Sequence, residues 1–263
     1  EDQARVIKII GKSSVSYPED VEDIYREYVF LSRLINHPNV VKMVDMMHSI
    51  HRIYFVFETA GERNLSQTLT GRPGQRLPED STLHVFDQVL SALAYCHSKN
   101  VSHRNVSMEH VAVDSALRCK LLDFRAAIVS KGNQTSRNPC GRLPCIPPQV
   151  ALGQNYVPRL ADAWSLGVLL LETAGGLNAL SQSVSYPPEG ANLPLVAQRI
   201  VTFFQGRGSH AAALSGLGAV LNSGVVTILE SLIVPDEGSR TELRDLYKAR
   251  APQPEQPREP SDS

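Results

Sequence analysis

The stretch VSHRNVSMEHVAVDSALRCKLLDFR, residues 101–125, gathers polar side chains around two short apolar runs. The runs HVAV (110–113) and CKLLDF (119–124) favour two short strands. His103, Arg104 and Asn105 then lie in the loop before the first strand, and Asp123 lies near the end of the second. This is the frame of an active-site loop, but Asn105 carries an amide, which is not a useful base near neutral pH.

The residues before this stretch predict strands and one helix. RVIKII (5–10), VVKMVDMM (40–47) and RIYFVFE (52–58) have the apolar and β-branched content of strands. Pro18, Glu19 and Asp20 supply a helix start, and this helix should end near NHPN (36–39). Its expected apolar stripe consists of Val21, Ile24, Tyr28, Leu31 and Ile35.

The residues after position 78 predict mainly helix. The helical segments are PEDSTLHVFDQVLSALAYCHSKN (78–100), RLADAWSLGVLLLETA (159–174), LNSGVVTILESLIV (221–234) and ELRDLYKA (242–249). In the first of them one face carries Leu83, Phe86, Leu90, Leu93 and His97, with His97 expected as a packed core residue. Pro and Gly make 130–148 an expected extended surface segment, and the Pro-rich 250–263 an expected disordered tail.

This order of elements predicts an α+β fold with a small sheet lobe followed by a larger, mainly helical lobe. Such an arrangement leaves a cleft between the lobes, where a ligand usually binds.

Composition narrows the function classes. Lys+Arg number 26 and Asp+Glu 27, so no global positive field attracts nucleic acid or an anionic membrane. No apolar run approaches the roughly 20 residues of a membrane span, and the acidic start does not resemble a signal peptide. The four cysteines show no Cys-x-x-Cys pair typical of zinc. We therefore expect a soluble, cytoplasmic protein with reduced structural thiols.

Six short motifs in order resemble the protein kinase family. They are VIKI (6–9), REYVFLSRLINHPNVVKMVD (26–45), HRN (103–105), DFR (123–125), PPQ (147–149) and DAWSLG (162–167). The chain looks most like the Ser/Thr-type calmodulin-dependent and AMP-activated branch. The resemblance implies a bilobal kinase-like domain over 1–249, with a partial small lobe (1–58), a hinge (59–63) and a large lobe (64–249). The first strands and the Gly-rich loop are missing, so we expect a fragment or an incomplete gene model.

The resemblance also implies a nucleotide site. Lys8 matches the lysine that holds the α- and β-phosphates of ATP, Glu27 matches its helix partner, and Asp123 matches the main Mg²⁺ ligand. The candidate cofactors are therefore ATP and Mg²⁺. The implied nucleotide-binding residues are Lys8, Val6, Phe57, Glu58, Ala60, Ala112 and Asp123. Val6 replaces a preferred alanine and narrows the purine site, whereas Ala112 makes room at its floor.

Framework positions are retained as well. The resemblance implies an apolar column linking the lobes, made of Leu31, Met43, Phe124 and His103. It implies that Asp162 anchors the backbone of the loop, and that Gln149 keeps a hydrogen bond to Arg240 in place of an ion pair.

The departures from the family pattern fall at positions that take part in phosphoryl transfer in the family. Asn105 replaces the catalytic aspartate, Ser107 replaces a lysine that meets the transferred phosphate, and His110 replaces an asparagine that holds the second Mg²⁺. Imidazole nitrogen is a poor Mg²⁺ ligand. Arg125 replaces the glycine of Asp-Phe-Gly and narrows the backbone conformations there. Glu109 is the nearby carboxylate that a relocated base would need.

The segment after Asp123 carries candidate regulatory residues. Arg104 matches a family arginine that can hold a phosphate on this segment, and the candidate hydroxyls are Ser130, Thr135 and Ser136. An ordinary polar loop is the alternative.

These observations predict a pseudokinase, an allosteric or scaffolding partner of other proteins, for which ATP is a candidate ligand. Two alternatives stay open: an active or weakly active Ser/Thr kinase using Mg²⁺ on Asp123, and a nucleotide sensor in which ATP affects shape only. Because Arg125 and His110 bring positive charge to the metal position, nucleotide binding without Mg²⁺ is a further hypothesis. Nothing in the sequence indicates an oligomeric state.

Overall fold

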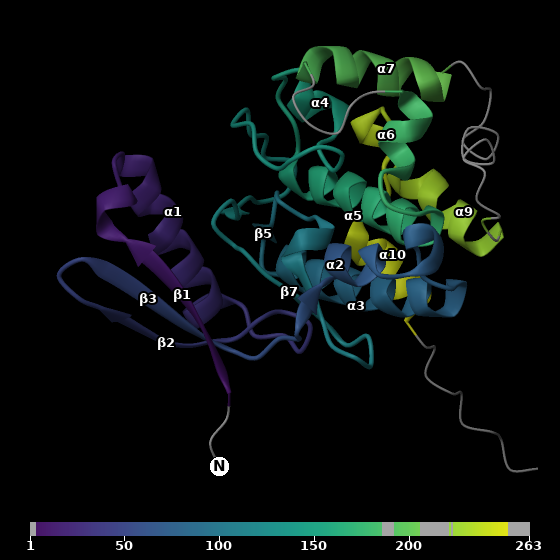
Figure 1. Cartoon of the computed structure of the whole chain (residues 1–263). Helices are drawn as coiled ribbons and strands as arrows, with labels where there is room; N and C mark the ends of the chain where they lie inside the picture. Colours follow the sequence, from purple (N-terminus) through teal and green to yellow (C-terminus); the bar gives the residue numbers. More distant parts are fainter. Residues whose placement is uncertain (1–3, 186–191, 206–220, 222, 252–263) are drawn as a thin grey trace, which may run out of the picture.

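The computed structural model describes residues 4–185, 192–205, 221 and 223–251, and it shows a small sheet lobe beside a larger helical lobe (Figure 1). Three strands and the helix α1 form the small lobe, and the helices α2 to α7, α9 and α10 belong to the large lobe. The predicted α+β fold with two unequal lobes is confirmed.

The small lobe contains an antiparallel sheet with the strand order β1-β3-β2. Its strands are β1 (Arg5–Gly11), β2 (Met43–His48) and β3 (Arg52–Glu58), close to the predicted ranges. Lys8 pairs with Phe55 across β1 and β3, and Ile9 pairs with Tyr54. Because side chains alternate between the faces of a strand, Lys8 and Ile9 point to opposite sides of the sheet.

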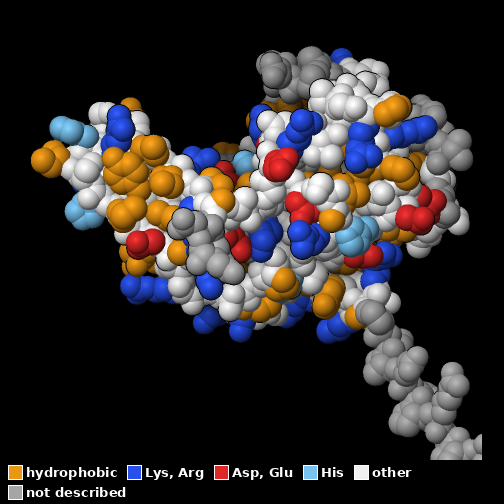
Figure 2. Space-filling model, turned by 60° about the horizontal axis from the view of Figure 1, so that its bottom comes forward, with side chains coloured by type: hydrophobic (Ala, Val, Ile, Leu, Met, Phe, Trp, Pro, Cys, Tyr) orange, Lys and Arg blue, Asp and Glu red, His pale blue; other side chains and the backbone are white. Residues whose placement is uncertain are grey.

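The sheet face that carries Ile9 is open to solvent. Ile7 and Ile9 of β1 and Met47 of β2 are exposed, and Figure 2 shows hydrophobic side chains gathered on the small lobe. The register places these three residues on one face, since Ile9 and Met47 both pair with Tyr54 and Ile7 lies two residues from Ile9. The small lobe therefore has one covered face and one exposed apolar face.

The helix α1 (Pro18–Val29) starts at the predicted proline and continues into a π-helical turn, Phe30–Leu34. The amide of Ile35 donates to the carbonyl of Phe30, the i→i−5 bond of that turn. Leu31 and Ile35 are buried as expected, but the prediction for Val21 is wrong, because Val21 is 56% exposed. Val21 lies in the first turn of α1, and more than half of its surface faces solvent.

The large lobe is built around α5 (Pro158–Gly175), most of whose side chains are buried. Helix α3 (Glu79–Ser98) packs on α5, and α10 (Leu243–Arg250) packs on α3. The other helices are α2 (Leu65–Thr70), α4 (Pro148–Ala151), α6 (Ala179–Val184), α7 (Leu193–Gln205) and α9 (Ser223–Leu232). The predicted helices of this lobe are confirmed, with Leu83 only half-buried on its face of α3.

Short strands position the polar loop. β4 (Arg63–Asn64), β6 (Val111–Val113) and β7 (Cys119–Leu121) form one sheet, and β5 (Val101–Ser102) pairs with β8 (Ile128–Val129). Short 3₁₀ turns cover Lys12–Ser14, Pro73–Gln75, Met108–His110 and Glu237–Ser239. Gly61, between the lobes, has φ of +128°, and a Cβ there would lie 2.5 Å from the carbonyl oxygen of Val113. Only glycine allows this close approach.

Two further predictions have mixed outcomes. In the segment 130–148, residues 131–135 are exposed, but Ser130 and the stretch from Cys145 to Pro148 are buried, so the expectation of a surface segment is wrong at both ends. The tail prediction lies almost wholly outside the described residues. The four cysteines form no disulfide with one another.

Within the described ranges, no helix has both the length and the apolar character of a membrane span.

Candidate functional site

A cleft of about 430 Å³ lies between the two lobes. Its walls include every residue that the sequence predicted for the nucleotide: Val6, Lys8, Phe57, Glu58, Ala60, Ala112 and Asp123. Glu27, His110 and Arg125 line it too, whereas Asn105 does not. The volume falls in the range of small-molecule sites.

Lys8 and Glu27 form an ion pair at the inner end of this cleft. The Lys8 ammonium lies 2.8 Å and 2.6 Å from the two Glu27 carboxylate oxygens. Glu27 is the only buried side chain of α1 itself, and burial raises its pKa against the lowering effect of Lys8. The pair ties α1 to β1 and presents a cation to the cleft.

Asp123 is held by Arg125 in a bidentate pair. Arg125 Nε donates to Oδ1 and Arg125 Nη2 donates to Oδ2, both at 2.8 Å. Burial alone would raise the pKa of Asp123, but the hydrogen bonds and charge of Arg125, with Lys8 and His110, outweigh it and hold the pKa well below its usual range. Sequence reasoning placed Arg125 here but missed this pairing.

The backbone accommodates Arg125 without strain. Asp123 has φ of +60°, and Arg125 is absent from the non-glycine residues with positive φ. The left-handed conformation therefore falls on Asp123, and Arg125 does not need the backbone freedom of the glycine that it replaces. The carbonyl of Arg125 accepts a bond of 3.1 Å from Arg26 Nη1 of α1.

The altered loop residues contact one another. His110 Nδ1 lies 2.8 Å from the carbonyl oxygen of Asn105 and 3.3 Å from Ser107 Oγ, while His110 Nε2 lies 3.3 Å from Asp123 Oδ2. Ser107 is buried, so its hydroxyl cannot reach into the cleft as a lysine would. The Asn105 side chain has no hydrogen-bond partner in the part of the chain that the structure describes.

Asp162 of α5 anchors this loop, as the resemblance implied. Its Oδ2 accepts from the amide of His103 at 2.8 Å, and its Oδ1 accepts from the amide of Arg104 at 2.6 Å. His103 Nε2 donates to the carbonyl of Leu122, and its ring meets Phe124 edge to face with 4.8 Å between centroids. Leu31, Met43, Phe124 and His103 are all buried, consistent with the predicted column.

Some of the candidate regulatory residues already make contacts within the protein. Arg104 is buried, and its guanidinium donates to the carbonyl of Ala126 at 2.7 Å and to the Tyr156 hydroxyl at 3.2 Å. Ser130, one of the candidate hydroxyls, is buried, and its Oγ lies 3.1 Å from Ser102 Oγ. Thr135 is exposed, and Ser136 is half-buried and pairs through its backbone with Tyr156.

A family model described as the protein kinase domain matches residues 1–248. This chain belongs to the protein kinase family. The match covers both lobes of the structure, including the cleft between them.

The curated relatives of this kinase domain are Ser/Thr kinases, as predicted. Serine/threonine-protein kinase SIK2 of Gallus gallus is 34% identical over 195 residues, 74% of this chain and 23% of that protein. SIK1 of Mus musculus is 35% identical over 195 residues, 74% of this chain and 24% of that protein. CBL-interacting serine/threonine-protein kinase 24 of Arabidopsis thaliana is 32% identical over 178 residues, 67% and 39% of the two chains. The kinase domain matches about a quarter of the length of the two SIK proteins.

The residues at the metal position do not fit Mg²⁺. The family holds this ion on the equivalents of Asp123 and His110. Here Arg125 donates to both oxygens of Asp123, and His110 offers nitrogen where Mg²⁺ requires oxygen. No group of three His, Cys, Asp or Glu within the described ranges is placed to hold a metal ion.

Sequence reasoning missed one wall of the cleft. Arg63 and Asn64 of β4 and Gln67 in the first turn of α2 line it. Asn64 Oδ1 accepts from the Gln67 amide at 2.8 Å, and Gln67 Oε1 accepts from the Asn64 amide at 3.1 Å. This capping box was visible in the sequence as Asn-x-x-Gln at residues 64–67.

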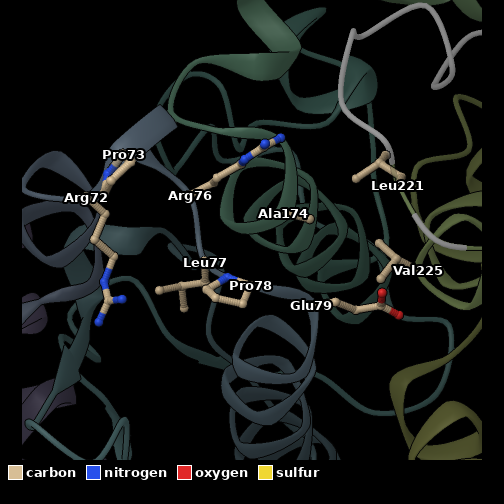
Figure 3. Close-up of a pocket in the computed structure, with 9 residues that line it drawn as sticks. All are labelled: Arg72, Pro73, Arg76, Leu77, Pro78, Glu79, Ala174, Leu221 and Val225. Carbon is tan, nitrogen blue, oxygen red and sulfur yellow. The ribbon is translucent and has the colours of Figure 1, made fainter.

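A second cavity of about 420 Å³ lies where the start of α3 meets the end of α5 (Figure 3). Its walls are Arg72, Pro73, Arg76, Leu77, Pro78, Glu79, Ala174, Leu221 and Val225. None of the predicted site residues lines it, so the cleft between the lobes is the candidate functional site.

Proposed function

We propose that this kinase domain does not transfer phosphate efficiently and acts by binding a nucleotide and another protein. One observation carries the proposal. The carboxylate that a kinase uses for Mg²⁺, Asp123, is paired in bidentate fashion with Arg125. The neighbouring loop adds Asn105 in place of a base, and losing a positioned base costs on the order of 10²–10⁴ in rate.

The nucleotide part of the proposal is supported by the retained cleft. Lys8 and Glu27 are paired, which leaves the lysine oriented by a buried carboxylate. Phe57 and Ala112 supply apolar walls beside it. The cleft therefore offers an apolar surface for a purine and a cation for a phosphate.

The protein partner is proposed from the exposed apolar face of β1 and β2. Ile7, Ile9 and Met47 are each about half exposed on that face. Contiguous exposed apolar side chains often mark protein–protein surfaces. A cytoplasmic location, expected from the sequence, belongs to the same proposal.

A phosphoryl-transfer assay tests the catalytic part. The wild-type chain should transfer no more γ-phosphate to itself or to a generic Ser/Thr substrate than a Lys8→Met variant does. The triple variant Asn105→Asp, Ser107→Lys, His110→Asn restores three chemical positions and should gain activity only if Arg125 is also replaced by glycine, which releases Asp123. Wild-type transfer that Asp123→Ala abolishes would overturn the proposal.

The second candidate is a weakly active Ser/Thr kinase, favoured by the intact Lys8–Glu27 pair. In that case Glu109, which lines the cleft, would be the catalytic base. Its carboxylate lies 3.8 Å from the guanidinium of Arg142. Activity that falls on Glu109→Gln but survives Asn105→Ala would support this candidate. Equal loss with both substitutions would count against it.

The partner role has its own test. The double variant Ile7→Gln, Ile9→Gln should abolish stoichiometric co-purification of a protein partner, whereas Tyr25→Gln on the exposed side of α1 should not. Size-exclusion chromatography of a cell extract gives the opposing outcome. If the wild-type chain elutes at the mass of a single chain, the partner role is contradicted and the proposed nucleotide binding is unaffected.

A further inference from the structure

The cleft of this kinase domain carries a fixed cation at the position of the family's metal. Arg125 donates two of its five N–H groups to Asp123, at 2.8 Å each. The three remaining N–H groups have no hydrogen-bond partner among the described residues, and the side chain is 51% exposed. The guanidinium therefore neutralises Asp123 and keeps donors for a second anion.

Charge counting shows what Arg125 changes. Lys8, Glu27 and Asp123 together carry one negative charge, which repels a phosphate group unless a divalent cation offsets it. Adding Arg125 brings the sum of these four formal charges to zero. Arg125 therefore offsets the net negative charge of Lys8, Glu27 and Asp123 with a side chain of the protein.

His110 adds to the same effect by its position. Its Nε2 lies 3.3 Å from Asp123 Oδ2. Arg125 and His110 thus take up both oxygens of Asp123. A divalent cation entering here must first break the bidentate pair, and charge-assisted bidentate pairs are among the stronger hydrogen bonds in proteins.

We propose that the cleft binds an adenine nucleotide without Mg²⁺, with the Arg125 guanidinium supplying the positive charge that the metal supplies elsewhere in the family. This inference rests on the proposed nucleotide binding. Guanidinium groups suit phosphate oxygens because their planar donors bind two oxygens at once. Mg²⁺ should then bring no gain in affinity, and it competes with the protein for the phosphates.

The test is ATP binding by the full chain, measured by calorimetry and thermal shift in EDTA and in MgCl₂. The wild type should bind equally well or better in EDTA. Arg125→Gln, which keeps much of the side-chain volume but removes the charge, should weaken binding in EDTA about tenfold or more. Arg125→Gly should make binding dependent on Mg²⁺, because it leaves the Asp123 carboxylate free.

Arg118→Gln is the matched control. Arg118 also pairs with an aspartate, Asp114, at 2.6 Å, but it lies on the exposed loop between β6 and β7. This variant should bind ATP as the wild type does, and melting curves without ligand show whether each variant is folded. Wild-type binding that requires Mg²⁺, or unchanged binding by Arg125→Gln, overturns the inference alone. No binding in either buffer overturns the proposed nucleotide binding on which the inference rests. Phosphoryl transfer by the wild type overturns the proposed lack of catalysis instead, so the two failures are distinguishable.

Discussion

His97 Nε2 lies 2.8 Å from Oδ2 of Asp162, and both side chains are buried in the large lobe. The same oxygen accepts the amide of His103, so a residue of α3 fixes the carboxylate that holds the loop. His97 is therefore more than the packed core residue that its helix face predicted. It joins α3, α5 and the loop in one hydrogen-bond network.

The first prediction follows from this network. Asp162→Ala leaves the amides of His103 and Arg104 and the ring of His97 without their acceptor in the core. Breaking a buried polar network of this kind costs about 3–5 kcal/mol, so chemical denaturation should show a loss of that size. Asp245→Ala removes an exposed carboxylate and should change stability by less than about 0.5 kcal/mol. Equal effects of the two substitutions would show that Asp162 does not anchor the loop.

Much of the fold was predictable because its elements depend on local patterns. Strand β3 coincides with the run RIYFVFE, and α1 begins at the predicted Pro18. The error at Val21 has a non-local cause. Periodicity shows that a residue shares a face with Ile24, but it does not show how far the elements packed against that face extend, and Val21 is 56% exposed.

The site was predictable in its residues but not in its pairing. Motif order brought Lys8, Glu27 and Asp123 to one cleft, and the structure places all three there. The bond between Asp123 and Arg125 depends on the backbone between them, because the left-handed turn at Asp123 decides which way the guanidinium points. In the same way, the burial of Ser130 depends on the pairing of β5 with β8, which joins residues far apart in the sequence.

The second prediction concerns Gln149. Its Oε1 accepts from Arg240 Nη2 at 2.7 Å, and its amide nitrogen donates to the carbonyl of Pro235 at 2.5 Å. Burial lowers the pKa of Arg240 to about 10. The guanidinium is shielded from water and depends on acceptors of the protein such as Gln149. Gln149→Ala should destabilise the fold by about 1–3 kcal/mol and lower the Tm by several degrees. Gln154→Ala, at an exposed site on the adjoining loop, is the control, and a Tm equal to that control would contradict the role of Gln149.

A buried carboxyl group makes stability depend on pH. Glu172 lies in α5, 2% exposed, and its Oε1 has no hydrogen-bond partner among the described residues. Burial, with the nearby charge of Glu109, raises its pKa from 4.5 to about 8. Between about pH 4.5 and 8 the Glu172 carboxyl group is therefore protonated in the folded state and ionised in the unfolded state. The contribution of Glu172 to stability is full below the unfolded pKa and is lost as the pH rises through the folded pKa.

The third prediction is that Glu172→Gln stabilises the kinase domain at alkaline pH. The amide is neutral at every pH, so the variant avoids the cost of charging a buried group. Urea denaturation at about pH 5, 7 and 8.5 should show a gain over the wild type that grows with pH, reaching about 2–4 kcal/mol at the highest value. Glu79→Gln, which alters an exposed carboxylate at the start of α3, should show no such trend. A gain for Glu172→Gln that is the same at all three pH values would mean that the carboxyl group does not titrate in this range, and that the amide acts by hydrogen bonding alone.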